Sequence, residues 1–195
     1  MKVGLYFGSF NPVHVGHMII ANYMINYTDM DAIWMVLSPH NPLKKKSTLA
    51  NDYDRLHLLN LAIGDHDKIR SSDIEFGLPR PSYTIDTMAY LEEKYPKHEF
   101  CLIMGGDNLS SFHKWKNYEL LLKRYSIYIY KRPLFELNEL IDHPHVHVCE
   151  APLLQISSST IRQMIRDKKS IRYLVPDKVF EYLRDYPVYE KLLNQ

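Results

Sequence analysis

The sequence predicts an α/β fold with a doubly wound, mainly parallel sheet, helices on both faces of that sheet and a helical segment at the C-terminus. Two observations lead to this prediction. Short apolar runs without polar alternation, typical of strands covered on both faces, recur along the chain, and 32–37 is the clearest example. Stretches with helical spacing of apolar residues separate these runs, so the chain consists of successive strand–helix–strand units.

The elements are assigned in chain order from these runs. The strand at 2–7 is followed by a glycine-containing turn and a helix over 18–27, and the strand at 32–37 completes the first unit. A helix over 51–63 has Asp52 as its expected N-cap. The following elements are a strand within 68–76, a helix over 84–95, a strand over 100–104, a helix over 115–122 and strands over 126–130 and 145–149. Two or three helices follow residue 156, with Pro176 and Pro187 as breakers.

Length and composition are those of a protein with one hydrophobic core. The chain has 195 residues, 46% of them hydrophobic, which is enough for one good core and too little for a second complete domain. It contains no internal repeat, low-complexity tract or linker. We therefore predict a single domain over residues 1–195.

Charge and cysteine content limit the cellular setting and the partners. The 24 Lys and Arg residues against 23 Asp and Glu residues leave a formal charge of +1, which does not indicate a nucleic-acid-binding protein. Cys101 and Cys149 lie in apolar runs without C-x-x-C spacing, so we expect packing residues. We expect no leader, because the first residues do not show a charged segment followed by an apolar one, and the sequence contains no apolar stretch of membrane length. We expect a cytoplasmic protein without nucleic-acid or membrane partners, and a homo-oligomer remains open.

The junction of the first strand and the first helix, residues 8–17, is predicted to hold phosphate. The first turn of a helix has unpaired N–H groups and a partial positive charge, and Gly8 and Gly16 let the backbone approach an anion. His14 and His17 are three residues apart, so they project from one face of an opening helical turn. Two imidazoles aimed at one spot can donate hydrogen bonds to phosphoryl oxygens. The alternative is that one His caps the helix and the other is a half-buried surface residue.

A second anion site is predicted at 157–162, where several hydroxyl side chains begin a helix. One hydroxyl can cap the helix while the others face an anion, and Arg162 in the opening turn provides a planar fork for phosphate oxygens. The lysines at 44–46 follow a strand at the sheet edge where α/β proteins bind ligands. The alternatives are an ordinary N-cap with an exposed Arg and a solvated lysine loop.

The segment 8–17 resembles the (T/H)-x-G-H signature of the nucleotidylyltransferase superfamily, whose members transfer a nucleotidyl group from ATP or CTP to an acceptor. Phe7 and Asn11 depart from the pattern, because many members have Gly and Asp there. The segment 156–162 is similar to the second signature, I-S-S-T-x-I-R, with a Ser–Thr pair in place of the usual Thr and variable residue. The resemblance implies a Rossmann-like fold. The matching residues of the first signature are Gly8, Phe10, Pro12, His14, Gly16 and His17.

Three further segments resemble bacterial nicotinate-nucleotide adenylyltransferases: 82–87, 105–109 together with Trp115, and 170–176. The resemblance then covers nearly the whole chain, from residue 1 to about residue 182. It implies adenylyl transfer from ATP to nicotinate mononucleotide, which gives deamido-NAD and pyrophosphate. It also implies a Mg²⁺ ion bound mainly through the ATP phosphates, and no metal site built from side chains.

The resemblance assigns residues to each substrate. Tyr83 and Thr84 would receive the nicotinate carboxylate on backbone N–H groups, and Trp115 would stack on the pyridine ring. Asp107 would bind ribose hydroxyls or help to hold the metal, and Arg132 would meet the acceptor phosphate. The ATP site would consist of Gly8, Ser9, Phe10, His14, His17, Lys44, Ile156, Ser157, Ser158, Ser159 and Arg162. The expected catalytic residues are His14, His17, Lys45 and Arg162.

The chemistry expected of this set is charge neutralisation. The 5′-phosphate of the acceptor is already an anion, so its attack on the α-phosphorus needs no general base, and no covalent intermediate is expected. Three alternatives remain open. The acceptor could be nicotinamide mononucleotide or phosphopantetheine, or the chain could be a catalytically silent nucleotide-binding module on the same fold. The third is a metal-binding role for His143, His145 and His147, although no carboxylate or thiol completes that set.

Overall fold

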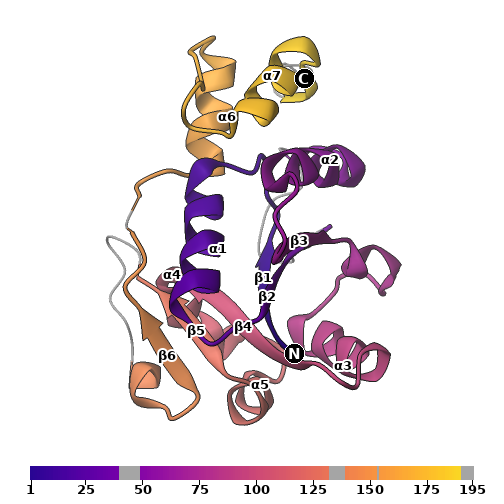
Figure 1. Ribbon diagram of the computed structural model, residues 1–195, viewed down its shortest axis with the longest axis vertical. Coiled ribbons are helices and arrows are strands. Elements are labelled where there is room, and N and C mark those ends of the chain that lie inside the picture. The colour runs from indigo at the N-terminus through magenta and orange to yellow at the C-terminus, as the bar shows by residue number, and fades with distance from the viewer. Residues whose placement is uncertain (40–48, 132–138, 153, 190–195) are drawn as a thin grey trace.

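The computed structural model describes residues 1–39, 49–131, 139–152 and 154–189. They form a six-stranded sheet in the order β3-β2-β1-β4-β5-β6, in which every neighbouring pair is parallel (Figure 1). The direction of winding changes between β1 and β4. This confirms the doubly wound fold class. The strands are β1 (Lys2–Gly8), β2 (Ala32–Leu37), β3 (Ile69–Ser72), β4 (Glu99–Gly105), β5 (Ile127–Tyr130) and β6 (Val146–Cys149).

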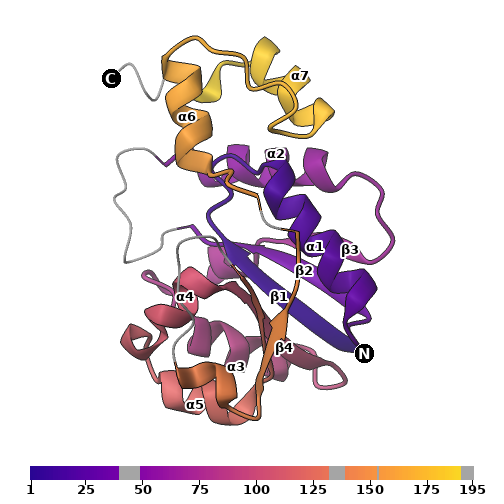
Figure 2. The same cartoon turned by 90° about the vertical axis from the view of Figure 1, so that its left-hand side faces the viewer.

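Helices cover both faces of the sheet. The α-helices are α1 (Val15–Tyr27), α2 (Asp52–Ile63), α3 (Thr84–Lys94), α4 (Gly106–Ser110), α5 (Tyr118–Arg124), α6 (Ser158–Arg166) and α7 (Asp177–Asp185). Short 3₁₀ turns lie at η2 (Ile74–Gly77), η3 (Phe112–Lys114) and η4 (Glu139–Asp142). Figure 2 shows α6 and α7 together at one end of the molecule, as the C-terminal helical segment.

Two hydrophobic cores lie on the two faces of the sheet. Residues of α1 and α2 form one core with α6 and α7, and residues of α3 and α5 form the other. Successive side chains of a strand point to opposite faces, so Leu5 packs into one core and Tyr6 into the other. The central strands need apolar side chains on both faces, which explains their continuous apolar runs.

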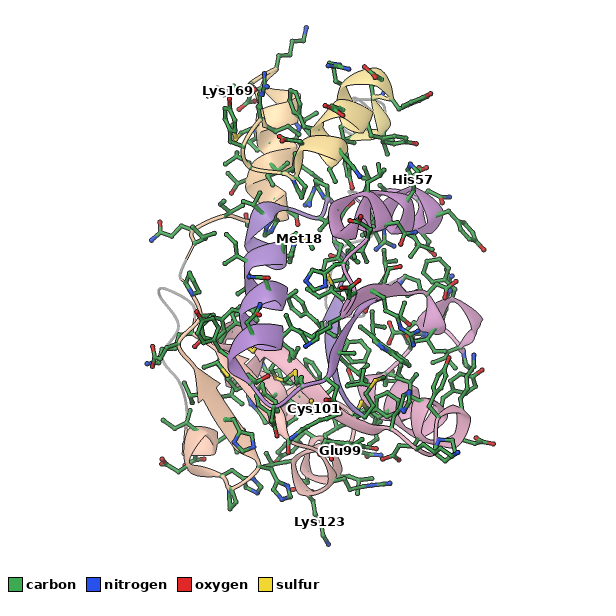
Figure 3. All side chains as sticks on the ribbon, in the orientation of Figure 1. Met18, His57, Glu99, Cys101, Lys123 and Lys169 are labelled. Carbon is green, nitrogen blue, oxygen red and sulfur yellow. The ribbon has the colours of Figure 1, made fainter. Side chains whose placement is uncertain are left out.

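The two cysteines lie in the interior of the protein, and charged side chains such as those of Lys123 and Lys169 lie on its surface. Cys101 and Cys149 are both buried and free. Figure 3 shows Cys101 inside the molecule, whereas Lys123 and Lys169 extend away from it at opposite ends.

All six strands predicted from the sequence are present, but some helix boundaries were predicted wrongly. The first helix begins at Val15, not Met18, and Asn51 caps α2 through a bond from the Tyr53 N–H group, where Asp52 was expected. The helix predicted over 115–122 runs over Tyr118–Arg124, because Asn117 adopts a left-handed conformation (φ 53°) that separates it from the preceding turn. The short helix α4 was not predicted.

Candidate active site

A cavity of about 470 Å³ lies where β1 and β4 end, at the point where the winding changes direction. Open α/β sheets bind ligands at this point. Every predicted ATP-site residue that the structure describes lines this cavity, and Asp107 from α4 lines it as well. The predicted residues brought together here are Gly8, Ser9, Phe10, His14, His17, Ile156, Ser157, Ser158, Ser159, Arg162 and Asp107.

The loop after β1 is shaped by a close contact between Gly8 and Phe10. A Cβ atom on Gly8 would lie 2.8 Å from ring carbons of Phe10, so a larger residue at position 8 would collide with that ring. Phe10 itself has a φ of 42°, which is uncommon for a residue with a side chain, and its ring is buried. Gly8 and Phe10 therefore pack closely against each other in the wall of the cavity.

The two histidines form a stacked pair at the start of α1. His14 is the N-cap residue, and its ring lies 3.6 Å from the ring of His17, with 24° between the planes. The backbone N–H of His14 donates to Nδ1 of His17 at 3.2 Å. An Nδ1 that accepts a hydrogen bond has no proton, so a neutral His17 has its proton on Nε2. The expected common projection of the two side chains is confirmed.

The N-terminus of α6 is joined directly to the loop after β1. Ser157 caps α6 by accepting a hydrogen bond from the Thr160 N–H group at 3.1 Å, as the sequence predicted. Ser158 Oγ donates to the carbonyl oxygen of Pro12 at 2.9 Å, and Nη1 of Arg162 donates to the carbonyl oxygen of Asn11 at 2.7 Å. Arg162 is the fifth residue of α6, beyond the opening turn in which it was expected. The two predicted anion sites are therefore hydrogen-bonded to each other and line the same cavity.

A buried arginine connects the loops around the cavity. Arg55 is fully buried, and its guanidinium donates to the carbonyl oxygens of Ser9, Ser38, Pro39 and Ala50 and to Asp52. Asn11 completes the connection, because its Oδ1 accepts the Ala50 N–H at 3.1 Å. Asn11, one of the two residues that depart from the first signature, thus joins the loop after β1 to the residues before α2. Lys44, Lys45 and Arg132 lie outside the described residues.

Of the predicted acceptor residues that the structure describes, Asp107 lines this cavity, whereas Tyr83, Thr84 and Trp115 do not. Tyr83 is the N-cap residue of α3 and Thr84 is its first residue, so the expected helix start is confirmed. Trp115 directly follows η3 and is half-buried, and its ring lies 5.3 Å from that of Phe112 in the second core. Lys116 spans the two segments through an ion pair with Asp86 at 2.8 Å.

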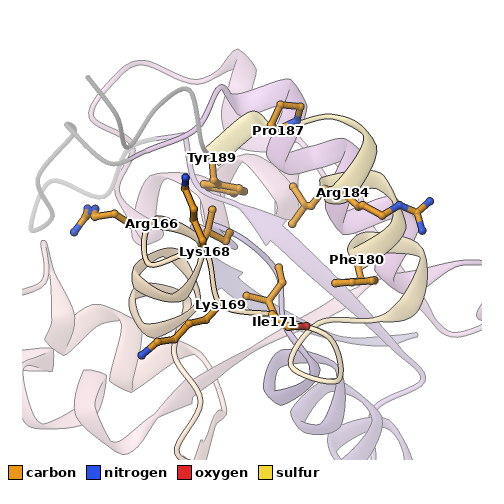
Figure 4. Close-up of a pocket in the computed structure, with 11 residues that line it drawn as sticks. Arg166, Lys168, Lys169, Ile171, Phe180, Arg184, Pro187 and Tyr189 are labelled. Carbon is orange, nitrogen blue, oxygen red and sulfur yellow. The ribbon is translucent and has the colours of Figure 1, made fainter.

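A second cavity, of about 570 Å³, lies between α6 and α7 (Figure 4). Apolar side chains such as Ile171 and Phe180 line it together with basic ones such as Lys168 and Lys169. It contains none of the residues predicted for either substrate. The cavity at the strand ends is therefore the candidate active site.

Comparisons with known proteins agree with this site. A model of the cytidylyltransferase-like family matches residues 5–164. A relative from Flavobacterium psychrophilum, described as a probable nicotinate-nucleotide adenylyltransferase, is 53% identical over 193 residues, which cover 98% of this chain and 100% of the relative. The chain belongs to the nicotinate-nucleotide adenylyltransferases of the cytidylyltransferase-like family. Another relative with the same description, from Flavobacterium johnsoniae, is 55% identical over 193 residues, with the same coverage.

Solved structures show the fold of this adenylyltransferase family. Nicotinic acid mononucleotide adenylyltransferase from Plasmodium falciparum, in complexes with APC and with NaAD, superposes on this chain with a TM-score of 0.82. The identity is 22%, and the match covers 97% of both chains. At that identity, the similarity establishes a common Rossmann-like architecture.

Sequence reasoning missed two buried charged residues, Glu75 and Arg55, and several residues that line the candidate site. Glu75 is buried beside Ser38, and it accepts a hydrogen bond from Thr87 Oγ1 of α3 at 2.8 Å. Burial raises the pKa of Glu75, while hydrogen bonds with Thr87, Ser38 and Ser82 act in the opposite direction. No motif marked Glu75 or Arg55, because a charged residue within a helical or irregular stretch is normally solvated. The cavity-lining residues that were missed are Tyr6, Phe7, Asn11, Leu49, Asn108 and Tyr130.

Two further observations concern metals and membranes. Nucleotidyltransferases of this type typically need a divalent metal ion, but the described part of the chain contains no group of three or more His, Cys, Asp and Glu residues that could hold one. Among the described residues, no helix is long and apolar enough to cross a membrane.

Proposed function

We propose that this protein transfers the adenylyl group of ATP to nicotinate mononucleotide, giving deamido-NAD and pyrophosphate in NAD biosynthesis. The observation that carries the proposal is the union of two distant segments around one cavity. Ser158 and Arg162 contact the carbonyl oxygens of Pro12 and Asn11, so both predicted phosphate sites face the same space. Relatives of nearly equal length described as probable nicotinate-nucleotide adenylyltransferases support the choice of reaction.

The reaction is a direct displacement at the α-phosphorus. An oxygen of the acceptor 5′-phosphate forms the new bond to this phosphorus, and the bond to the bridging oxygen of the β-phosphate breaks, so pyrophosphate leaves. The nucleophile is already ionised, and the main obstacle is the approach of two polyanions. The Mg²⁺ ion enters with ATP, as part of the substrate, and supplies positive charge at the phosphates.

His14, His17 and Arg162 provide donors on the protein side. Because Nδ1 of His17 accepts the His14 N–H, the proton on Nε2 is the one that can be donated to a phosphate oxygen. Arg162 has five N–H donors, and the single bond to Asn11 leaves others for phosphate. We assign Lys45, with Lys44, to the same charge neutralisation. Ser157, Ser158 and Ser159 bring the positive end of α6 to the phosphates.

The acceptor is assigned to the segments that begin α3 and follow η3. Thr84 offers the N–H groups and positive dipole end of a helix of 11 residues, which suit a carboxylate better than the neutral amide of nicotinamide. Trp115 offers a half-buried aromatic face for the pyridine ring. Asp107, in the wall of the cavity, is assigned to the ribose hydroxyls, and Arg132 to the acceptor phosphate.

A single assay tests the proposal. The purified protein is incubated with Mg²⁺, ATP and either nicotinate mononucleotide, nicotinamide mononucleotide or phosphopantetheine, and both pyrophosphate and the dinucleotide product are measured. We expect deamido-NAD in amounts equal to the pyrophosphate released, with a much higher kcat/KM for the nicotinate acceptor. Product from another acceptor alone, or no product from any of them, would contradict the proposal.

A further inference from the structure

Lys116 connects the two segments assigned to the acceptor. Its Nζ lies 2.8 Å and 3.1 Å from the two carboxylate oxygens of Asp86 on α3. The same ammonium group lies 4.8 Å from the centre of the Tyr83 ring, in a cation–π arrangement at the N-cap of that helix. Lys116 itself directly follows Trp115 in the chain. One side chain therefore contacts the start of α3 from the segment that carries the aromatic face.

Asp86 poses an electrostatic problem for an anionic acceptor. It is the third residue of α3, so its carboxylate lies in the first turn, where the helix dipole favours negative charge. A nicotinate carboxylate bound at the same turn competes for the same positive end of the helix. The two negative charges also repel each other. A neutral nicotinamide ring experiences no such repulsion.

We propose that Lys116 and Asp86 determine the charge specificity of the acceptor site. Lys116 neutralises Asp86 and thereby keeps the start of α3 favourable for a ring that carries a carboxylate. This inference rests on the proposed function and adds two residues to it, one of which favours the acid while the other opposes it. Both act on the acceptor through charge, and neither is required for transfer itself.

The exposure of the pair makes the inference testable without loss of the fold. The side chains of Lys116 and Asp86 are 44% and 52% exposed, so their ion pair contributes little to stability. Asp86 is exposed, whereas the neighbouring Ile85 is buried in the core. Neutral variants of similar size, Lys116→Gln and Asp86→Asn, should therefore fold normally.

The experiment compares four variants with the wild type. Lys116→Gln, Asp86→Asn, the double variant and the control Lys114→Gln are assayed for kcat/KM with nicotinate and nicotinamide mononucleotides. Lys114 is an exposed residue of the same segment, with no ion pair among the described residues. We expect the acid-to-amide ratio to fall about threefold in Lys116→Gln and to rise about threefold in Asp86→Asn, as for one screened surface charge. The double variant and Lys114→Gln should both stay close to the wild type.

The changes should appear in the KM for the nicotinate acceptor, while kcat and the KM for ATP stay nearly constant. Raising the salt concentration should shrink the differences between variants. A purely structural bridge predicts something else, because both single variants and the double variant would then weaken both acceptors alike. Either that result or unchanged acid-to-amide ratios would contradict this inference and leave the proposed function standing. A wild-type protein that uses neither acceptor overturns the proposed function and this inference with it.

Discussion

Nη1 of Arg162 donates a 2.7 Å hydrogen bond to the backbone carbonyl of Asn11, although 151 residues separate the two in the chain. Burial lowers the pKa of Arg162, but a guanidinium remains charged at any physiological pH. Arg162 therefore holds the loop after β1 and presents a positive charge to the cavity at the same time. A lysine could supply the charge but not the planar geometry.

Replacing Arg162 by Lys should therefore reduce catalysis more than stability. We expect kcat/KM for ATP to fall at least tenfold, while the free energy of unfolding drops by about 1 kcal/mol for the lost hydrogen bond. Steady-state kinetics and urea denaturation measure the two effects. The matched control is Arg166→Lys on the same helix, whose exposed guanidinium binds Gln163 at 2.8 Å. Equal kinetic losses in both variants would contradict a specific role for Arg162.

His17→Asn should distinguish the role of Nδ1 of the His17 ring from that of Nε2. The amide oxygen of Asn can take the place of Nδ1 and accept the His14 N–H, but nothing replaces Nε2. We expect kcat to fall by about 10²–10³-fold, as for the loss of one donor to transition-state charge, with little change in Tm. Turnover near that of the wild type would show that Nε2 does not face the reacting phosphate.

Arg55→Met should be strongly destabilising, because it leaves four carbonyl groups, two of them buried and two part-buried, without this donor. The expected loss in the free energy of unfolding is about 3–5 kcal/mol, typical of breaking a buried charged network. Arg80→Met provides a close comparison, since Arg80 binds the same Asp52 carboxylate at 3.1 Å but is 54% exposed. That variant should lose less than about 1 kcal/mol in urea denaturation. Similar losses in both would mean that the buried carbonyl contacts add nothing.

Glu75→Gln should change how stability depends on pH. Because burial raises the pKa of Glu75 above its value in the unfolded chain, the folded state holds this proton more tightly. The resulting stabilisation is complete at a pH below the unfolded-state pKa and is lost as pH rises through the raised one. Gln keeps the oxygen that accepts from Thr87 and never ionises, so the variant should lose less stability over this range.

Urea midpoints from pH 4 to pH 8 would test the Glu75 prediction, with Glu93→Gln on the exposed side of α3 as the control. The wild type and the control should share one slope, and Glu75→Gln should have a flatter one. Parallel slopes in all three proteins would mean that Glu75 has the same proton affinity in the folded and unfolded states.

The four inner strands β1, β2, β4 and β5 were predictable because burial on both faces demands continuous apolar runs. The ends of helices were less predictable. Val15 and Gly16, for example, lack the polar residues that mark the opening turn of a helix. The helix α4 has only five residues and begins at Gly106, so it has too few positions to show any period. Asn117 interrupts the expected helix by its backbone conformation, which its identity permits but does not require.

The candidate site was predictable where its residues lie in two recognisable segments, and unpredictable where contacts join distant parts of the chain. Nothing near Arg55 in the sequence indicates that its guanidinium meets carbonyl groups after β1 and between β2 and α2. Likewise, the pairing of Lys116 with Asp86 spans 30 residues and depends on the packing of α3 beside α5. Such partners follow from the three-dimensional arrangement of the sheet and helices.

The bond from Ser158 to Pro12, across 146 residues, means that the candidate site is completed late in synthesis. The ribosome completes β1 and its loop early, and the sheet can grow strand by strand behind them. The segment that closes the site is made only after the sixth strand. A nascent chain that ends before Arg162 therefore lacks one wall of the candidate site, however much of the sheet it has already formed.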